Sequence, residues 1–172
     1  GTTAYDYISS YNGTYIGSAA STPTVLGVPM PYNFAVKLPG GSNDFITIPS
    51  NTNFNQTGDG TWEIWFKPIS FATEQVLISK GETANMSFIL GVTPSTGKLY
   101  FGTGGNITIN NSGSSLTLNQ WNHIAVGWAT VGSTFEVKFY KNGIQNGSTA
   151  TIPNSFPTNT DPAVIGSSLL YN

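Results

Sequence analysis

The 172-residue sequence contains no cysteine and no arginine, and only 8% of its residues are charged. Without cysteine, the chain can form no disulfide framework, thiolate metal site or cysteine nucleophile. Its six positive residues are all lysines, which are scattered along the sequence, and the formal net charge is −2. Binding to nucleic-acid phosphates requires clustered basic residues, and so does electrostatic binding to anionic lipids. We therefore expect no nucleic acid as a partner.

Long hydrophobic runs are also missing. The longest apolar stretch, residues 124–129, has the length of a strand, whereas a membrane-spanning helix needs about 20 apolar residues. We expect no membrane insertion. Aromatic residues make up 13% of the chain, which is too much apolar area for a disordered protein to leave in water. The size fits one domain, and a neutral composition rich in Thr, Ser, Asn and Gly is typical of extracellular, cell-surface or virion proteins.

Alternation of apolar and polar residues with a period of two dominates the chain, and no segment shows a helical period. The pattern predicts strands at residues 34–38, 45–48, 61–67, 76–80, 87–92, 98–101, 107–109, 121–129, 135–140, 144–152 and 163–165. Asn142-Gly143 predicts a type I′ turn between two of them. Residues 17–31 contain three prolines, which predict an irregular crossing. Many short strands with regular turn signals indicate a sandwich or barrel.

The two faces of the strongest strands can be assigned from this alternation. In residues 61–67, Trp62, Ile64 and Phe66 share one face, and Glu63 and Trp65 lie on the other. Residues 121–129 and 135–140 divide in the same way. The residues expected to face the core from these two segments are Ile124, Val126, Trp128, Phe135, Val137 and Phe139. A recognition surface is expected on the opposite, mixed face, which also carries aromatic side chains.

A series of segments in this order resembles the laminin G-like, concanavalin A-like lectin/glucanase jelly-roll superfamily. The segments are Ala4-Tyr-Asp6, Tyr11-Asn-Gly-Thr-Tyr-Ile-Gly17, Asp44-Phe-Ile-Thr-Ile-Pro49, Thr61-Trp-Glu-Ile-Trp-Phe-Lys-Pro68, Leu77-Ile-Ser-Lys-Gly81, Gly97-Lys-Leu-Tyr100, Asn119-Gln-Trp-Asn-His-Ile-Ala-Val126, Val137-Lys-Phe-Tyr-Lys-Asn-Gly143 and Ile165-Gly166. The resemblance implies an all-β fold, a two-sheet antiparallel jelly-roll sandwich, over a single domain at residues 1–172. The family pattern continues into a further strand after Ile165-Gly166. The domain is therefore expected to lack its C-terminal closing strand, either because sequence was lost or because a neighbouring chain supplies that strand.

The same resemblance raises the question of glycoside hydrolysis, because the superfamily includes β-glucanases. Those enzymes place their carboxylates as Glu-x-Asp-x-x-Glu on one strand face. The corresponding strand here offers only Glu63, and position 65 is Trp. The single histidine, His123, lies inside a predicted strand and is interpreted as a structural residue. We predict that the protein is not an enzyme, and a β-glucanase-like hydrolase remains an alternative.

Calcium is the cofactor that the resemblance leaves open, because superfamily members often bind it through oxygens of the rim loops. Calcium prefers six to eight oxygen ligands, usually including carboxylates. The candidate ligands are Asp6, Asp44 and Asp59, together with Asn43 and Asp161. The alternative is that these aspartates are ordinary turn residues, which Asp favours for contacts with its own backbone.

Sugar binding needs aromatic surfaces for stacking and polar groups for hydrogen bonds. The candidate residues for such a platform are Trp65, Trp121, Tyr100, Tyr140, Glu63 and Asn122, with Lys138 near them. The alternative is that Trp65 and Trp121 pack beneath rim loops or a third small sheet. The sequence thus predicts a non-catalytic recognition or attachment module of a virion or extracellular assembly, such as a phage fibre or capsid decoration. Its expected partner is a glycan or a neighbouring subunit, in an oligomer or larger assembly. A purely structural subunit is the main alternative.

Overall fold

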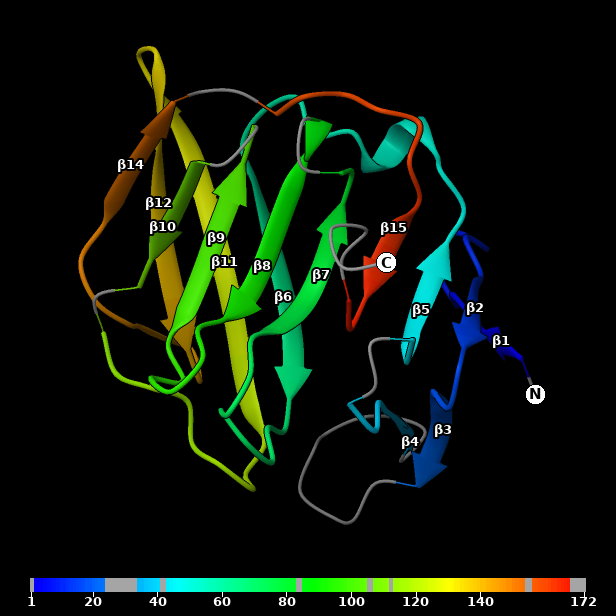
Figure 1. Ribbon diagram of the computed structural model, residues 1–172. Helices are drawn as coiled ribbons and strands as arrows, with labels where there is room; N and C mark the ends of the chain where they lie inside the picture. The colour runs from blue at the N-terminus through cyan, green and yellow to red at the C-terminus, as the bar shows by residue number, and fades with distance from the viewer. Residues whose placement is uncertain are drawn as a thin grey trace.

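The protein folds into two antiparallel β-sheets packed face to face, with a small two-stranded sheet at one side (Figure 1). The computed structural model describes residues 2–23, 34–40, 43–82, 85–104, 107–111, 113–153 and 156–167. Within these ranges there is no α-helix, and the one helical element is a 3-10 turn, η1, at Thr52–Phe54. None of the described segments is a helix long and apolar enough to cross a membrane. The predicted all-β jelly-roll sandwich is confirmed.

The larger sheet has eight strands. In spatial order they are β1 (Thr3–Ala4), β2 (Gly13–Ile16), β5 (Phe45–Ile48), β15 (Ala163–Ile165), β7 (Gln75–Lys80), β8 (Phe88–Val92), β9 (Leu99–Thr103) and β10 (Ile107–Asn110). The smaller sheet has five, namely β13 (Ile144–Gln145), β12 (Thr134–Lys141), β11 (Asn122–Val131) and β6 (Gly60–Phe66), with β14 (Ala150–Pro153) also paired to β12. The separate hairpin joins β3 (Ala20–Pro23) to β4 (Phe34–Lys37).

Two segment predictions need correction. Residues 144–152 were expected to form one strand, but they form β13 and β14 with a break between them. At the break, Asn146 turns inward, where its Oδ1 accepts the N–H of Ser114 at 2.8 Å and its Nδ2 donates to the Ser114 carbonyl at 2.9 Å. Part of the predicted irregular crossing forms β3, where Pro23 is tolerated because it ends a strand of a two-stranded sheet. Residues 17–19 are irregular, as predicted, and residues 24–31 lie outside the described residues.

The main hydrophobic core fills the space between the two sheets. Its buried members are Leu77, Phe88, Leu90, Val92, Leu99, Phe101, Leu116, Ile124, Val126, Trp128, Phe135, Val137, Phe139 and Ile152. All six residues that the alternation assigned to the core face of β11 and β12 belong to this cluster. Trp62, Ile64 and Phe66 of β6 pack against it and are partly buried. Burial of these large apolar side chains is the main force that holds the two layers together.

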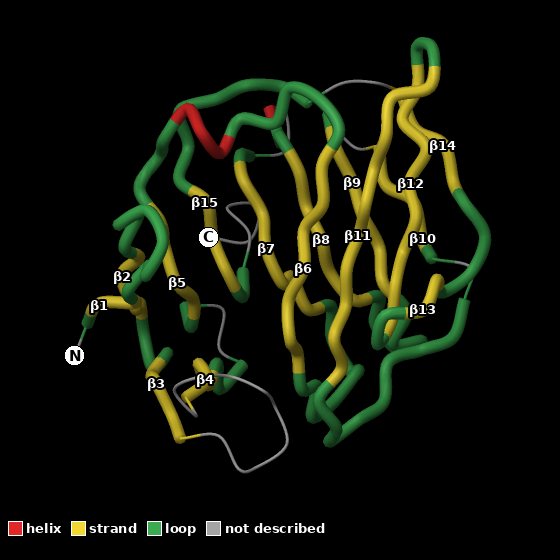
Figure 2. The backbone as a smooth tube through the Cα atoms, turned by 180° about the vertical axis from the view of Figure 1, so that it is seen from behind, coloured by secondary structure: helices red, strands yellow, loops and turns green. Residues whose placement is uncertain are grey.

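The two layers differ in width. Figures 1 and 2 show β15, β5, β2 and β1 continuing past β6, the last strand of the smaller sheet on that side. Within the described strands, β6 pairs with β11 and with no other strand. The described core cluster contains no residue from β1 to β5. The two-layered part of the molecule is therefore built from the chain after β5, and the N-terminal strands extend one sheet beyond it.

Candidate functional site

The outer face of β6, β11 and β12 carries the mixed set of side chains that the sequence predicted. Along β6, Glu63 and Trp65 are exposed and alternate with the partly buried Trp62, Ile64 and Phe66. Trp65 exposes 37% of its surface. This alternation follows from the two-residue period of a strand, because one face packs on the core and the other meets water.

Glu63, Trp65 and His123 form one cluster on this face. His123 pairs directly with Trp65 across the strands, and their ring centroids are 5.1 Å apart at an interplanar angle of 48°. The Nε2 of His123 lies 3.5 Å from the Oε2 of Glu63, and the two side chains are 25% and 70% exposed, respectively. An exposed pair of this kind adds at most about 1 kcal/mol to stability. Its main effect is to hold the imidazole between a carboxylate and the indole.

The floor of this surface is made of small residues on β11. Ala125 lies between Glu63 on β6 and Tyr140 on β12, and the next outward residue, Gly127, lies between Thr61 and Lys138. A Cβ added at Gly127 would lie 4.0 Å from Cε2 of Tyr140. The Tyr140 ring therefore borders the position of Gly127. A strip of small side chains thus runs between two rows of larger ones.

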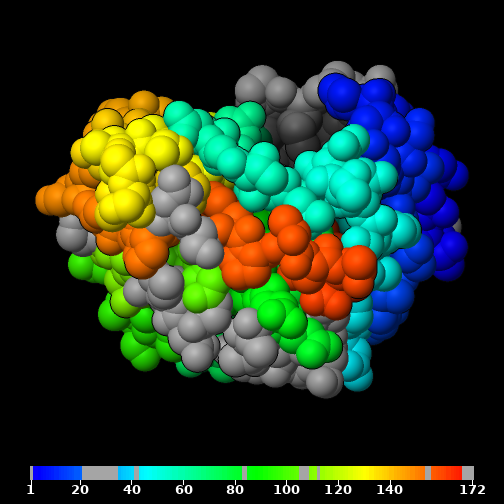
Figure 3. Space-filling view, turned by 90° about the horizontal axis from the view of Figure 1, so that it is seen from above, coloured from blue at the N-terminus to red at the C-terminus, as the bar shows by residue number. Residues whose placement is uncertain are grey.

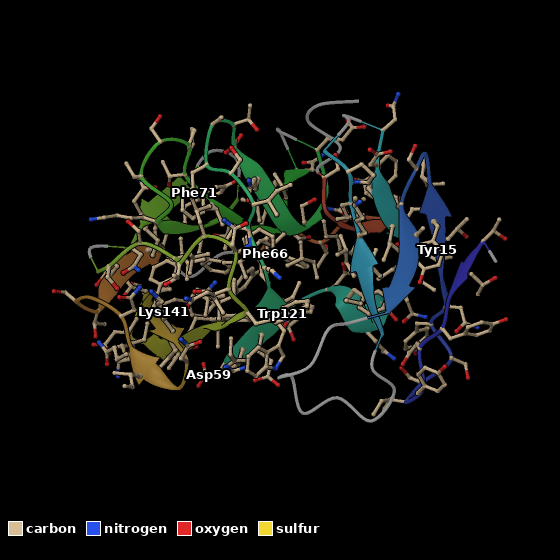
Figure 4. The ribbon with its side chains drawn as sticks, turned by 90° about the horizontal axis from the view of Figure 1, so that it is seen from below. Tyr15, Asp59, Phe66, Phe71, Trp121 and Lys141 are labelled. Atoms are coloured by element: carbon tan, nitrogen blue, oxygen red, sulfur yellow. The ribbon has the colours of Figure 1, made fainter. Side chains whose placement is uncertain are left out.

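Trp121 and Lys138 complete the predicted residues near this surface. Trp121 is half-buried and directly precedes β11. Figure 4 shows it at the end of the sandwich where β6 finishes at Phe66. Lys138 is half-buried on the outer face of β12. Glu63, Trp65 and Tyr140 share one face with Lys138, and Trp121 lies at the end of that face.

The structure does not bring Tyr100 to this surface. Tyr100 belongs to β9 of the other sheet, is 4% exposed, and packs with Val76, Met86 and Ile89. Its neighbours along the strand, Leu99 and Phe101, face the main core, so Tyr100 points to the opposite side of its sheet. There its ring covers Gly91, where an added Cβ would lie 2.4 Å from the ring. Tyr100 therefore fills the space above a glycine and is separated from Trp65 by both layers.

Asn122 is likewise a structural residue. It is 1% exposed and begins the inward-facing row of β11. Its Oδ1 accepts the N–H of Thr117 at 3.0 Å, and its Nδ2 donates to the carbonyls of Thr117 at 3.0 Å and Gln120 at 2.8 Å. These bonds close the turn before β11. The amide group is thus occupied inside the molecule and does not reach the outer face.

Asp6, a candidate calcium ligand, organises its own loop. Its carboxylate accepts hydrogen bonds from the N–H of Ile8 at 2.9 Å, the N–H of Tyr11 at 3.0 Å, and the hydroxyl of Ser9 at 2.6 Å. These donors, the Ser9 hydroxyl first, lower the pKa of Asp6 to about 2 because they favour the charged form. The oxygens are therefore used as loop acceptors.

Asp44 and Asp59 lie in two other loops. Asp44 Oδ1 accepts the N–H of Ser18 at 2.7 Å. Asp59 Oδ1 accepts both the hydroxyl and the N–H of Thr130 at 2.7 Å each, and these bonds, the hydroxyl first, lower the pKa of Asp59. Across the described ranges, no group of three or more His, Asp or Glu side chains is placed to hold a metal ion. Each aspartate stands in its own turn, as Asp residues in turns commonly do.

His123 is the residue of the cluster that sequence reasoning assigned to a different role. Its backbone N–H does donate to Asn142 Oδ1 at 2.9 Å, but its ring contacts Trp65 and Glu63. The outward position of His123 follows from alternation with Ile124. The pairing with Trp65 depends on strand register, which a single sequence does not reveal.

A laminin G family model, described as that of the concanavalin A-like lectin/glucanases superfamily, matches residues 40–170. This range contains every strand from β5 to β15, and therefore both layers of the core and the whole outer face of β6, β11 and β12. No curated protein matches the sequence significantly.

Proposed function

The chain belongs to the concanavalin A-like lectin/glucanases superfamily, and on that premise we propose that it is a non-catalytic recognition module. Its binding surface is the outer face of β6, β11 and β12. The ligand is a glycan, which stacks on Trp65 and forms hydrogen bonds with Glu63 and Lys138 above the floor of Ala125 and Gly127.

The observation that carries this proposal is the exposed, supported indole of Trp65. The ring is 37% exposed on an open sheet face and rests against the His123 ring. A sugar presents an apolar face of C–H groups that can stack on such a ring, while its hydroxyls need polar partners at the edge. An aromatic side chain that is already held by a neighbour loses little conformational entropy when a ligand binds.

The spacing of carboxylates supports binding without hydrolysis. Glycosidases use two carboxyl groups about 5 to 9.5 Å apart. Glu63 pairs with Ala125, while Glu136, the other acidic residue on this face, pairs with Ala129. The two register positions differ by four residues, which is roughly 13 Å along a strand. Glu63 therefore has no second carboxylate at a hydrolytic distance on the described part of this face.

We place this module on the outside of a cell or virion, as an attachment domain of an extracellular assembly such as a phage fibre or capsid decoration. The low charge, the absence of cysteine and the abundance of small polar residues support this setting. The unpaired edge of β6 among the described strands also fits a protein that meets other chains, because free edges pair readily with further strands.

A glycan array tests the proposal directly. We expect specific sugar binding that falls by roughly tenfold or more in Trp65→Ala, because loss of stacking costs about 1.5 kcal/mol. Tyr5→Ala is the matched control, since Tyr5 is an exposed aromatic residue of the N-terminal loop, 68% accessible. Its binding should equal that of the wild type. Equal binding by Trp65→Ala and the wild type, or no binding to any glycan, would contradict the proposal.

An assembly subunit that contacts only other proteins is the second candidate. The observation in its favour is the loop that follows β1, where Tyr5, Tyr7 and Ile8 are 68%, 77% and 95% exposed. Neighbouring exposed apolar residues often mark an interaction surface. This role predicts oligomers in light scattering that dissociate in Ile8→Asp, together with no glycan binding. A monomer at all concentrations would contradict it.

A further inference from the structure

Lys80, at the end of β7, is buried in a way that is rare for lysine. Its exposed fraction is 0%, and it pairs with Phe88 on one side and Ala163 on the other. The side chain therefore shares the core-facing side of the sheet with Phe88, a member of the main core. Lysine is almost never fully buried unless its ammonium group is paired, so the surroundings of its Nζ must provide acceptors.

Those acceptors come from the segment that leads into β15. Lys80 Nζ donates to Asn159 Oδ1 at 2.7 Å and to the backbone carbonyls of Asn159 and Asp161, both at 2.9 Å. Figure 3 shows this segment, in orange, crossing the end of the molecule against the green part of the chain that includes the end of β7. Two segments 79 positions apart in sequence thus meet through one amine and one carboxamide.

The carboxamide of Asn159 is held in a fixed orientation. Its Oδ1 accepts a second hydrogen bond, from the N–H of Asp161 at 3.1 Å. Its Nδ2 donates to the Asn85 carbonyl at 2.6 Å and to the Ser87 hydroxyl oxygen at 3.2 Å. The N–H of Asp161 therefore polarises the C=O bond toward oxygen, which makes Cγ more electrophilic. The nitrogen is held by a different set of groups from those around the Lys80 amine.

The electrostatics of the amine also favour a nucleophile. Burial lowers the pKa of Lys80, and the negative charge of Asp161 opposes this effect in part. A lower pKa increases the fraction of neutral amine at a given pH, and the neutral amine is the nucleophilic form of lysine.

We propose that Lys80 and Asn159 form an intramolecular isopeptide bond. The neutral form of Lys80 attacks Cγ of Asn159 with its Nζ, forming the Nζ–Cγ bond. The negative charge that develops on Oδ1 is stabilised by the N–H of Asp161. A proton of the attacking amine then passes to Nδ2, the Cγ–Nδ2 bond breaks, and ammonia departs. The reaction needs no oxidant or other reactant, because an amine and a carboxamide give a secondary amide and ammonia.

Such a bond would give a covalent cross-link to a chain that has no cysteine to form disulfides. It would join the end of β7 to the segment before its neighbour β15 and close a covalent loop around the chain between them, as a disulfide does in many extracellular proteins. Unlike a disulfide, an amide does not respond to the redox state of the surroundings. The reacting groups are held within hydrogen-bond distance by the fold, so the proximity that drives intramolecular reactions is present once the protein has folded.

Intact-mass spectrometry of the purified chain tests this proposal. We expect a mass about 17 Da below that calculated from the sequence, which corresponds to loss of one ammonia. In a tryptic map, cleavage after Lys80 should be absent, and a branched peptide should join the Lys80 and Asn159 peptides. An unmodified mass after prolonged incubation would overturn the proposal. A loss of about 17 Da that maps to an Asn-Gly succinimide, with Lys80 cleaved, would overturn it too.

Variants identify the groups involved. Lys80→Met and Asn159→Ala should each restore the calculated mass, whereas Lys37→Met, which alters an exposed lysine, should keep the loss. The branched peptide of the wild type is decisive even where a variant does not fold.

Discussion

Single carboxylates organise the loops of this protein, and Asp6 is the clearest case. Its oxygens accept the N–H groups of Ile8 and Tyr11 and the hydroxyl of Ser9. Three residues of one loop are therefore tied to one side chain. Such bonds to the charged form of a carboxyl group lower its pKa, here to about 2. The order of this loop depends on the ionised state of Asp6, because the charged carboxylate accepts these bonds. The loop also carries Ile8, the most exposed large apolar residue among those described.

The pH dependence of this loop follows from that pKa. The pKa of Asp6 in the folded chain lies below its ordinary value of 3.8, so its contribution to loop stability is present above pH 3.8 and is lost as the pH falls through about 2. We expect an NMR titration of the Asp6 carboxyl carbon to give a midpoint near that lower value. Ser9→Ala removes the largest cause and should move the midpoint toward 3.8. A wild-type midpoint near 3.8 would contradict this account.

For single residues, the sequence predicted the direction in which a side chain points better than the residues that it contacts. The alternation in β6 places Glu63 and Trp65 outward without any knowledge of the fold, because a strand has a two-residue period. Tyr100 and Asn122 were assigned to the same surface because they are polar or aromatic. Their actual positions depend on which sheet β9 joins and on the turn before β11, and both are set by contacts distant in sequence.

Among the elements, β11 lies at the centre of the smaller sheet and contributes to the main core. It pairs with β6 on one side and β12 on the other, and its Ile124 is 0% exposed within the main core. Replacing a buried isoleucine by alanine removes apolar contacts and leaves a cavity. We expect Ile124→Ala to lower the free energy of unfolding by about 2 to 5 kcal/mol, measured by urea denaturation.

Ile144→Ala is the matched control for this prediction. It is the same substitution on β13 of the same sheet, at a side chain that is 75% exposed. Its effect should stay within about 0.5 kcal/mol, as for most surface substitutions. Equal effects of the two variants would mean that the inward face of β11 has been assigned wrongly.

The strands show which elements can be predicted from a local sequence pattern and which cannot. Segments with strong alternation, such as β6, β11 and β12, could be predicted because burial on one face selects their residues. The break between β13 and β14 could not, since it depends on Asn146 bonding to Ser114, a residue 32 positions away. The short strands β1 and β2 have too few residues to show a period, and pairing with β5 stabilises β2.

The whole molecule is an uneven sandwich, and its stability should be uneven too. The smaller sheet ends at β6, while the larger one continues through β15 and β5 to β2 and β1 (Figures 1 and 2). Every member of the described core cluster comes from Leu77 or later in the chain. The N-terminal strands are joined to this core through the pairing of β5 with β15. Regions with few buried apolar contacts open locally at a lower free energy than the core does.

Native-state hydrogen exchange measures this difference strand by strand. We expect the amides of β2 and β5 to exchange through local opening, with free energies well below that of global unfolding, while amides of β8 and β11 exchange only when the whole protein unfolds. Low denaturant should therefore leave the exchange of β2 almost unchanged and accelerate that of β11, because only global unfolding exposes a large surface. Identical exchange free energies and denaturant slopes in β2, β5, β8 and β11 would contradict this view. The N-terminal strands would then share one cooperative unit with the core, to which the pairing of β5 with β15 joins them.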